Sequence, residues 1–150
     1  MLAVCTSKRK GIRKHDVGEA ELRPDWGIVG DAHAADWHRQ VSLLAWESIE
    51  KMRALGLNVN TGSFAENITT EGISLVDLPI GTRLRLGETL VEVTQIGKEC
   101  HSRCAIYTQA GDCVMPREGI FVVVREPGDV TVGDTVEVVS LGDGTCDRCE

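Results

Sequence analysis

The chain has 150 residues, of which 42% are hydrophobic and 26% charged, and its formal net charge at pH 7 is −7. A chain of this length buries a hydrophobic core without cross-links, so we expect one domain in which the six cysteines need not form disulfides. The acidic balance argues against general binding of nucleic acid or anionic membranes, which both require a basic face. No apolar run approaches the roughly 18 residues of a membrane-spanning helix. We therefore expect a soluble, cytoplasmic protein with reduced cysteines.

The first part of the chain is predicted to be irregular. Residues 2–4 indicate a short strand, and the residues up to Asp36 are then interrupted repeatedly by glycine and proline, at Gly11, Gly18, Pro24, Gly27 and Gly30. A cluster of basic side chains lies in this part: Lys8, Arg9, Lys10, Arg13 and Lys14. Such a cluster could meet a phosphate or an acidic partner, but we expect a solvated loop between two strands.

Residues 42–55 are predicted to form the main helix. Apolar residues recur there at spacings of four, three and three, at Ala45, Ile49, Met52 and Leu55. Ser42 is a candidate N-cap, and Gly56 is a candidate stop. We expect residues 43–55 to be the longest helix of the protein.

The rest of the chain is predicted to be mainly β. Strands are indicated at residues 64–69 and 82–86, and a Gly87-Glu88 turn joins the latter to a strand at residues 89–96. The apolar run 120–124 suits a strand that is buried on both faces. Residues 130–132 and 136–139, with Gly133-Asp134 between them, predict a second short hairpin. Many short strands and one helix indicate a mainly β fold, a closed or nearly closed β-barrel.

The segment from Gly97 to Cys104 is the strongest candidate site in the sequence. Lys98, His101 and Arg103 are or can become cationic, and nearby positive charge lowers the pKa of a thiol. We therefore expect Cys100 to be the reactive thiol. If the segment is helical, Cys104 lies one turn away on the same side and can resolve a modified Cys100 into a disulfide.

Alternative interpretations of these cysteines remain open. Cys100 and Cys104 could be small buried apolar residues. They could also join Cys113 and His101 in a zinc site, although the spacing is uncommon for zinc. Cys5, which lies among apolar neighbours, and Cys113 are expected to be inert.

An ordered series of short motifs runs through nearly the whole chain. Its members are Gly30-Asp31-Ala32-His33, Arg39-Gln40-Val41-Ser42-Leu43, Gly62-Ser63-Phe64-Ala65-Glu66-Asn67-Ile68, Ile80-Gly81, Leu84 to Leu86, a cysteine after Gly97-Lys98, and Gly133-Asp134. With this series, residues 1–140 resemble a MOSC domain, the family named for the carboxyl-terminal domain of molybdenum-cofactor sulfurases. The closest likeness is to the small standalone members.

The resemblance implies a β-barrel that binds molybdopterin or handles sulfur. Its cysteine, which ligates molybdenum or carries a persulfide, corresponds to Cys100. Natural partners for a cofactor phosphate are Lys98, Arg103 and Arg117. The remaining family-like positions, His33, Arg39 and Asn67, could contact the ligand or could be structural.

The implied function is molybdenum-cofactor binding and sulfur transfer in cofactor maturation. A sulfur donor such as a cysteine desulfurase, and a molybdopterin-synthesis or molybdoenzyme-maturation protein, are the expected partners. Two alternatives stay open: an enzyme that cleaves carbon–sulfur bonds through a cysteine persulfide, and a non-catalytic zinc or interaction module. Whether the protein is itself an enzyme is left open by the sequence.

Residues 141–150 are predicted to be a flexible acidic tail. The tail has no apolar anchor after Leu141, and it carries a Cys-x-x-Cys pair, Cys146 and Cys149. Without a flanking helix, a redox role for this pair is weakly supported. We expect the tail to be dispensable for folding.

Overall fold

The structure is a computed structural model that describes residues 1–9, 12–97 and 118–145. Within these residues it contains strands, one α-helix, α1 (Trp46–Ala54), and one short 3-10 helix, η1 (Leu75–Asp77). The strands are β1 (Ala3–Thr6), β2 (His15–Asp16), β3 (Glu19–Arg23), β4 (Gly27–Ile28), β5 (Val41–Ala45), β6 (Ile68–Thr70), β7 (Arg83–Leu86), β8 (Thr89–Ile96), β9 (Ile120–Glu126), β10 (Gly128–Thr131) and β11 (Val136–Ser140).

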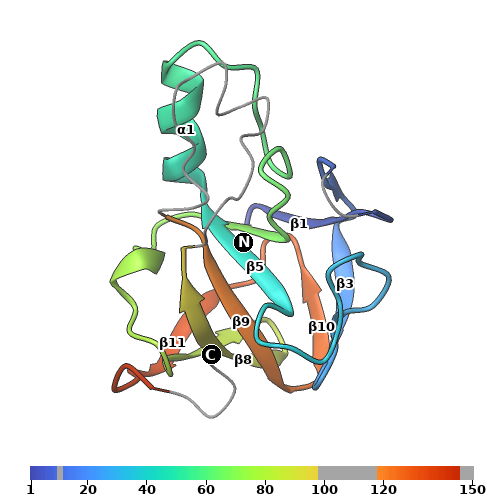
Figure 1. Ribbon diagram of the computed structural model, residues 1–150, viewed down its shortest axis with the longest axis vertical. Coiled ribbons are helices and arrows are strands. Elements are labelled where there is room, and N and C mark those ends of the chain that lie inside the picture. Colours follow the sequence, from blue (N-terminus) through green and yellow to red (C-terminus); the bar gives the residue numbers. More distant parts are fainter. Residues whose placement is uncertain (10–11, 98–117, 146–150) are drawn as a thin grey trace.

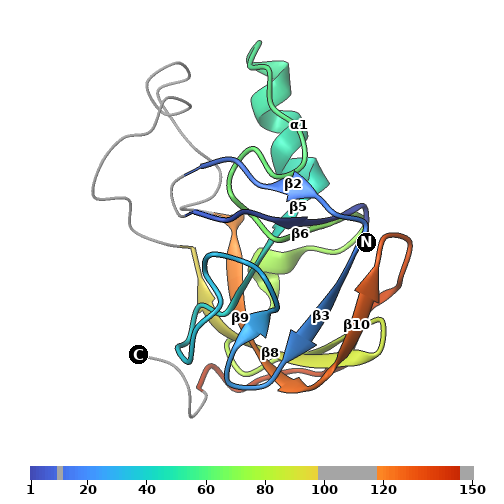
Figure 2. The same ribbon diagram turned by 90° about the vertical axis from the view of Figure 1, so that its right-hand side faces the viewer.

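The strands form one large and one small sheet. The large sheet has eight strands in the order β11-β7-β8-β9-β5-β6-β1-β2, and the small sheet has three in the order β10-β3-β4. The two sheets pack around a buried apolar cluster that includes Val4, Leu22, Leu43, Val91 and Val122. Figure 1 shows α1 extending from the end of β5, and Figure 2 shows β3 and β10 side by side.

The predicted mainly β fold is confirmed, whereas closure of the predicted closed or nearly closed barrel is not confirmed, because the described strands form two open sheets. Strand β2 and strand β11 lie at opposite edges of the large sheet and do not pair with each other. Strand β2 has only two residues, and the pairing of β11 with β7 is irregular between Val138 and Ser140. Short and irregular edges of this kind end a sheet instead of closing it.

The central hairpin is confirmed. Strand β8 covers Thr89–Ile96 as predicted, and it pairs with β7 across the Gly87-Glu88 turn. Strand β9 begins at Ile120 as predicted, and its first five residues are buried. It lies between β8 and β5 in the sheet, which explains its continuous apolar sequence.

The predicted helix starts too early. Residues 42–45 belong to β5, which pairs with β9 on one side and β6 on the other. Ser42 is therefore in a strand, and the N-cap of α1 is Ala45, which makes no side-chain cap bond. The helical spacing of Ala45 with Ile49 misled the prediction, because tertiary pairing of a central strand overrides it. Gly56, with φ +91°, follows the helix as expected.

Two other predictions need correction. Strands β10 and β11 do not pair with each other: β10 pairs with β3, and β11 pairs with β7. Residues 64–67 are a turn before β6, in which Ala65 has φ +61°. The expected irregular first part contains a five-residue strand, β3, with only Leu22 fully buried.

Residues 142–145 of the predicted tail are bonded to the body of the protein. Gly142 donates its N–H to Thr82 Oγ1 at 3.1 Å, and Gly144 donates to the carbonyl of Ile80 at 2.9 Å. Residues 146–150 lie outside the described part. Among the described helices, none has the length and apolar character needed to span a membrane.

Candidate functional site

A row of paired residues crosses the large sheet from β8 to β1. Gln95 in β8 and Ser42 in β5 both lie opposite Phe121 in β9. Asn67, just before β6, donates its N–H to the Ser42 carbonyl at 3.1 Å and accepts the N–H of Cys5 at 2.5 Å. Residues opposite one another in neighbouring strands point to the same face. We call these five residues the transverse row.

The transverse row lies on the α1 side of the sheet. Phe121 packs in a second apolar cluster with Leu44 of β5 and Ile49 of α1, whereas Leu43 and Val122 point into the main core. Four strand-to-strand steps separate β8 from β1, and at about 4.8 Å per step the row is about 19 Å long. The segment 31–39 connects its two ends, because Ala32 donates to the carbonyl of Ser7 beyond β1 and Arg39 reaches Gln95.

At the β8 end, Gln95 holds the side chains of His38 and Arg39. Its Oε1 accepts a hydrogen bond from Arg39 Nε at 3.0 Å and lies 2.9 Å from His38 Nε2. Because the guanidinium only donates, Oε1 is the acceptor, and His38 Nε2 must carry a proton. The guanidinium carbon of Arg39 also lies 5.3 Å from the centre of the Phe121 ring, a cation–π contact.

Gln95 also binds the backbone of Gly97, the last described residue before the segment 98–117. Gln95 Nε2 donates to the carbonyl of Gly97 at 2.7 Å. Gly97 in turn donates its N–H to the carbonyl of Gly119 at 2.6 Å. The two points that flank residues 98–117 therefore lie together, beside Arg39.

At the β1 end, Lys14 is the centre of a buried polar cluster. Its Nζ donates to Asp31 Oδ1 at 2.7 Å and to Ser7 Oγ at 3.1 Å, and it lies 2.9 Å from His33 Nδ1. The side chains of Lys14 and Asp31 are both fully buried, and that of His33 is 28% exposed. The expectation that Lys14 belongs to a solvated loop is therefore wrong, because its charge is paired inside the protein.

Asp31 is held ionised by its neighbours. Burial alone would raise the pKa of this carboxyl, but the hydrogen bond and positive charge of Lys14, the Ser7 N–H and the Asn67 amide together hold it below its ordinary value. The N–H of His33 also donates to Oδ2 at 3.1 Å. Asp31 therefore anchors both Lys14 and the backbone at His33.

Asn67 and its neighbour Glu66 are used to fix the local backbone. Asn67 Oδ1 accepts the N–H of Ser42 at 3.0 Å, and Nδ2 donates to the Cys5 carbonyl at 3.1 Å. Glu66 is buried and accepts hydrogen bonds from the N–H groups of Gly62 and Phe64. Both side chains hold the local backbone, which for Asn67 is one of the two roles that the sequence analysis left open.

Cys5 is buried and is almost entirely in the thiol form near neutral pH. Burial, and then the negative charge of Glu66, raise the pKa of the Cys5 thiol to about 12. The structure is thus consistent with the expected inertness of this cysteine.

The structure brings together three of the residues singled out in the sequence: His33, Arg39 and Asn67 lie on or beside the transverse row. The remaining predicted site residues lie outside the described residues, namely Lys98, Cys100, Arg103, Cys104 and Arg117, as do the alternative zinc ligands His101 and Cys113 and the tail pair Cys146 and Cys149. In the parts of the chain that the structure describes, no group of three or more His, Cys, Asp or Glu residues could hold a metal ion.

Sequence reasoning missed the importance of Lys14 and Gln95. Asp31 stands in the Gly-Asp-Ala-His motif, which was a signal for the β1 end of the row. Nothing in the sequence distinguishes Lys14 from the other basic residues near it, because its burial depends on the fold. Gln95 continues an alternating strand pattern and carries no signal of its own.

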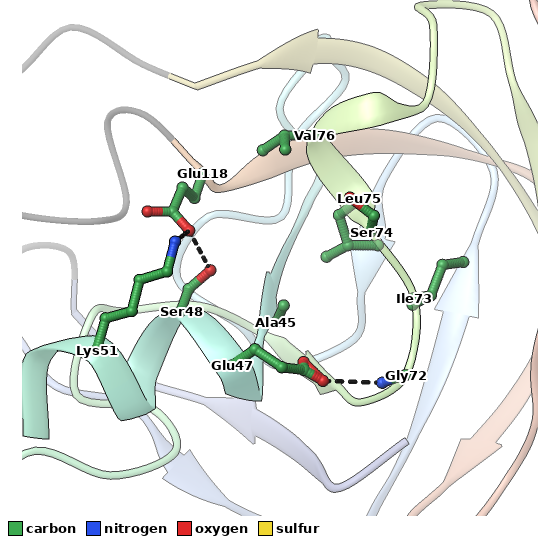
Figure 3. Close-up of a pocket in the computed structure, with 10 residues that line it drawn as sticks. All are labelled: Ala45, Glu47, Ser48, Lys51, Gly72, Ile73, Ser74, Leu75, Val76 and Glu118. Carbon is green, nitrogen blue, oxygen red and sulfur yellow. Dashed lines mark hydrogen bonds and ion pairs between the residues drawn. The ribbon is translucent and has the colours of Figure 1, made fainter. Parts of the chain in front are cut away.

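Two pockets lie away from the transverse row. One, of about 400 Å³, lies between the start of α1 and η1, and the Lys51–Glu118 ion pair of 2.9 Å lies at one side of it (Figure 3). The other, of about 540 Å³, is acidic, with Glu19, Glu88 and Asp129 in its lining. Neither contains a site residue predicted from the sequence.

The fold and the motif series together define a class of protein. The family model of the MOSC domain matches residues 30–137, so the chain belongs to the MOSC domain family. No curated protein matches the sequence.

Solved structures share the fold. The YuaD protein from Bacillus subtilis is 16% identical, with a TM-score of 0.75, and the match covers 91% of this chain and 92% of that one. YiiM from Geobacillus stearothermophilus is 18% identical over 95% of this chain and 76% of that one, with a TM-score of 0.69. YiiM from Escherichia coli is 22% identical over 95% and 71%, with a TM-score of 0.63. This chain spans 65% of another solved protein, described as hypothetical, at 23% identity and a TM-score of 0.69. At these identities the likeness shows the fold alone.

Proposed function

We propose that this MOSC domain binds a molybdopterin-type cofactor along the transverse row and uses Cys100 as a sulfur carrier or molybdenum ligand in cofactor maturation. The observation that best supports this proposal is the double role of Gln95. One amide binds Arg39 and the carbonyl of Gly97, and Cys100 follows Gly97 by three residues in the sequence. An anion-binding side chain thus lies where the chain leads into the cysteine segment.

Arg39 fits a phosphate-bearing ligand. Among the described residues its guanidinium donates only through Nε, to Gln95, so that Nη1 and Nη2 remain for an anion. The group is half-buried and is held against the Phe121 ring. A fixed, partly desolvated guanidinium binds phosphate well, because its two outer nitrogens match two phosphate oxygens. Lys98, Arg103 and Arg117 are proposed as further phosphate ligands on sequence grounds.

The sulfur step proposed for Cys100 is a thiol exchange. The Cys100 thiolate attacks the outer sulfur of a donor persulfide, R–S–SH, and the donor S–S bond breaks. The donor leaves as the thiolate RS⁻, and Cys100 becomes the persulfide Cys–S–SH, so no external oxidant is needed. The bound cofactor supplies a molybdenum centre for which a thiolate is a suitable soft ligand. A cysteine desulfurase is a suitable donor, and a molybdopterin-synthesis or molybdoenzyme-maturation protein is a suitable acceptor.

The experiment uses the full chain and three variants of it. Protein isolated from cells that make the cofactor is analysed for molybdenum, zinc and pterin fluorescence, and mass spectrometry follows sulfur addition from a persulfide donor. Cys100→Ser should lose the sulfur adduct. Arg39→Ala should retain at most about one tenth of the pterin that the wild type retains. The reason is the loss of a hydrogen bond to a charged group, which contributes about 1.5–3 kcal/mol to binding.

Arg53→Ala is the matched control for Arg39. Arg53 also packs over an aromatic ring, that of Trp46 at 5.7 Å, but it lies in the last turn of α1 and is not a member of the row. It should leave pterin and sulfur binding unchanged. Stoichiometric zinc without pterin or sulfur adduct would contradict the proposal and favour a non-catalytic zinc module. A sulfur adduct formed from a simple thiol compound, with no persulfide supplied, would favour carbon–sulfur bond cleavage.

A further inference from the structure

The pocket between the start of α1 and η1 is formed by two different kinds of surface. Its volume is about 400 Å³, which is within the range of small-molecule sites. Its apolar wall is formed by Ile73, Leu75 and Val76, which lie in and just before η1. Its polar side is formed by the first residues of α1. A pocket of this composition suits a small ligand that has both an aliphatic part and a polar part.

The first turn of α1 offers N–H donors that no side chain caps. The first N–H groups of an α-helix have no partner within the helix, and a side chain at the N-cap commonly accepts one of them. Here the N-cap is Ala45, and in the described part of the chain the first turn has no side-chain cap bond. Glu47 and Ser48 of this turn both line the pocket. Their N–H groups favour a negatively charged ligand atom.

Charged side chains of opposite sign lie at two places around this pocket (Figure 3). At one side, Lys51 Nζ donates to Glu118 at 2.9 Å, and the Lys51 side chain is 64% exposed. An ammonium has three donors, so Lys51 can bind a ligand carboxylate without losing Glu118. At the other side, Glu47 Oε1 accepts the N–H of Gly72 at 2.9 Å. A carboxylate accepts more than one hydrogen bond, so Glu47 can also accept from a ligand ammonium.

Thr70 adds a buried hydroxyl next to the pocket. It lies opposite Ala45 in the parallel pairing of β6 with β5. Its side chain therefore points to the same face of the sheet as that of Ala45, which lines the pocket. Thr70 is fully buried, and its Oγ1 has no hydrogen-bond partner among the described residues. Burying a hydroxyl without a partner is unfavourable, and a ligand in the pocket would supply the missing partner.

We propose that this pocket binds a free α-amino acid with an aliphatic side chain. An α-amino acid carries a carboxylate and an ammonium on one carbon, which matches the two charges and the uncapped helix start. Its carboxylate meets the N–H groups of the first turn of α1 and the Lys51 ammonium. Its own ammonium faces Glu47 and the Thr70 hydroxyl, and its side chain packs on Ile73 and Val76. This site is separate from the transverse row and from the cofactor proposed to bind there.

The test is a titration of the ¹⁵N-labelled full chain with L-norvaline, followed by ¹H–¹⁵N correlation spectra. The backbone signals of Glu47, Ser48 and Gly72 should shift and saturate, with a Kd of about 1 mM or below. Two fragments of the same molecule are the matched ligands: n-butylamine lacks the carboxylate, and pentanoate lacks the ammonium. Each should bind at least about tenfold more weakly, because each leaves one charged contact unmade.

Lys51→Met tests the contact with the carboxylate. It should weaken norvaline binding at least about tenfold, and norvaline should lose most of its advantage over butylamine. A general disturbance of the pocket would weaken both ligands alike. Arg23→Met is the matched control, because it breaks another exposed ion pair, that of Arg23 with Glu21 at 2.6 Å, outside the pocket. It should leave norvaline binding unchanged.

Two neighbouring threonines test the buried hydroxyl. Thr70→Val removes a hydroxyl that has no partner, so the unliganded protein should be at least as stable as the wild type, whereas norvaline binding should weaken about threefold to tenfold. Thr69 points to the opposite face of the sheet, and its Oγ1 donates to Glu66 Oε2 at 2.9 Å. Thr69→Val should therefore lower stability and leave the affinity for norvaline unchanged. Urea unfolding without ligand measures the stabilities.

Several results would overturn the proposal. No saturable shift of Glu47 and Ser48 below about 10 mM norvaline would exclude the site. Pentanoate or butylamine binding as tightly as norvaline would assign the pocket to a simple anion or cation. Unchanged norvaline binding in Lys51→Met, or a clear loss of stability in unliganded Thr70→Val, would contradict the contacts proposed here. None of these measurements involves pterin, molybdenum or Cys100, so their outcome is independent of the proposed function.

Discussion

Two buried carboxylates of this protein have pKa values shifted in opposite directions. Asp31 is paired with Lys14, and its pKa is lowered. Glu66 accepts hydrogen bonds from three donors and has no hydrogen-bonded cation within the described part of the chain, and burial raises its pKa despite these donors. A full positive charge offsets the desolvation of a carboxylate, whereas neutral donors offset only part of it.

Asp31 is expected to contribute stability that is lost in acid. Its folded pKa lies below the unfolded value of about 3.9, so the contribution is present above that pH and declines as the pH falls through the folded pKa. Asp31→Asn should lower the free energy of unfolding at pH 7 by about 3–5 kcal/mol, because Lys14 is left without a counter-charge. Its stability should then fall less steeply than that of the wild type below about pH 4. Urea unfolding at a series of pH values measures both effects.

Asp77→Asn is the control for this series. Asp77 is exposed and accepts a hydrogen bond only from Ser74 Oγ in the described part of the chain, at 2.6 Å. Its substitution should change stability by less than about 0.5 kcal/mol. An acid decline as steep in the Asp31 variant as in the wild type would show that other groups cause it.

Cys5 is expected to be the least reactive thiol. With its pKa raised to about 12, Cys5 is almost entirely in the thiol form at pH 7.5, with a thiolate fraction on the order of a thousandfold below that of an ordinary free thiol. Limited alkylation followed by mass spectrometry should therefore modify Cys100 first and Cys5 last. In denaturant, Cys5 should react like the others. Rapid labelling of Cys5 in the folded protein would contradict the burial on which this prediction depends.

At the scale of elements, the turn before β6 makes hydrogen bonds to both Glu66 and the backbone of Lys14. Gly62 donates to Glu66 and accepts the N–H of Lys14 at 2.9 Å, so this turn supports the backbone of the buried lysine. Gly62 has φ +81°, and a Cβ atom there would overlap the Lys14 carbonyl oxygen. Glycine is required here because any other residue would be strained at this positive φ, and because a Cβ atom would collide with the Lys14 backbone.

Comparing Gly62→Ala with Gly72→Ala separates the cost of backbone strain from the cost of steric overlap with Lys14. Gly72 has the same φ of +81°, but a Cβ atom there meets nothing within 4 Å. Gly72→Ala should therefore lose about 1–2 kcal/mol from backbone strain alone. Gly62→Ala should lose a further 1–3 kcal/mol or so, because the Lys14 backbone has to move. Chemical denaturation of both variants gives the difference, and equal losses would mean that the close approach to Lys14 has no energetic consequence.

The elements that the sequence predicted well are those whose patterns agree with their surroundings. Strand β8 has an alternating sequence, follows the Gly87-Glu88 turn, and has the predicted bounds at both ends. Strand β5 was assigned to the helix because Ala45 and Ile49 have helical spacing, and only its pairing with β6 and β9 shows otherwise. The three-stranded sheet was missed because β3 and β10 are far apart in sequence, and Leu22 is the only residue of β3 that is fully buried.

The candidate site likewise contains residues that the sequence predicted and residues that only the fold reveals. The motif series named His33, Arg39 and Asn67 because their residue types suit a polar ligand. It could not separate Arg39, which donates only through Nε within the described residues, from Asn67, whose amide is used by Ser42 and Cys5. Lys14 joins the site only through the approach of Asp31 and His33 from another segment. Such contacts depend on the fold and leave no local pattern.

At the scale of the whole molecule, both described ends of the chain lie against other parts of the fold. The amino group of Met1 donates to the carbonyl of Asp134 at 2.8 Å, between β10 and β11. Residues 142–145 return to the segment before β7, where Gly142 and Gly144 bond to Thr82 and Ile80. The tail therefore has a bonded part and a remainder, and the two should respond differently to deletion.

Deleting residues 146–150 should change the free energy of unfolding by less than about 0.5 kcal/mol, as for a surface change. Deleting residues 142–150 should lower the free energy of unfolding by about 1–3 kcal/mol. This deletion removes the two N–H groups that donate to Thr82 and Ile80, and each of these hydrogen bonds contributes about 0.5–1.5 kcal/mol. Urea unfolding of the two truncated chains beside the full chain measures the difference. A large loss from the shorter deletion would contradict this division, and would mean that Cys146 and Cys149 take part in a structural contact or bind a stabilising ligand.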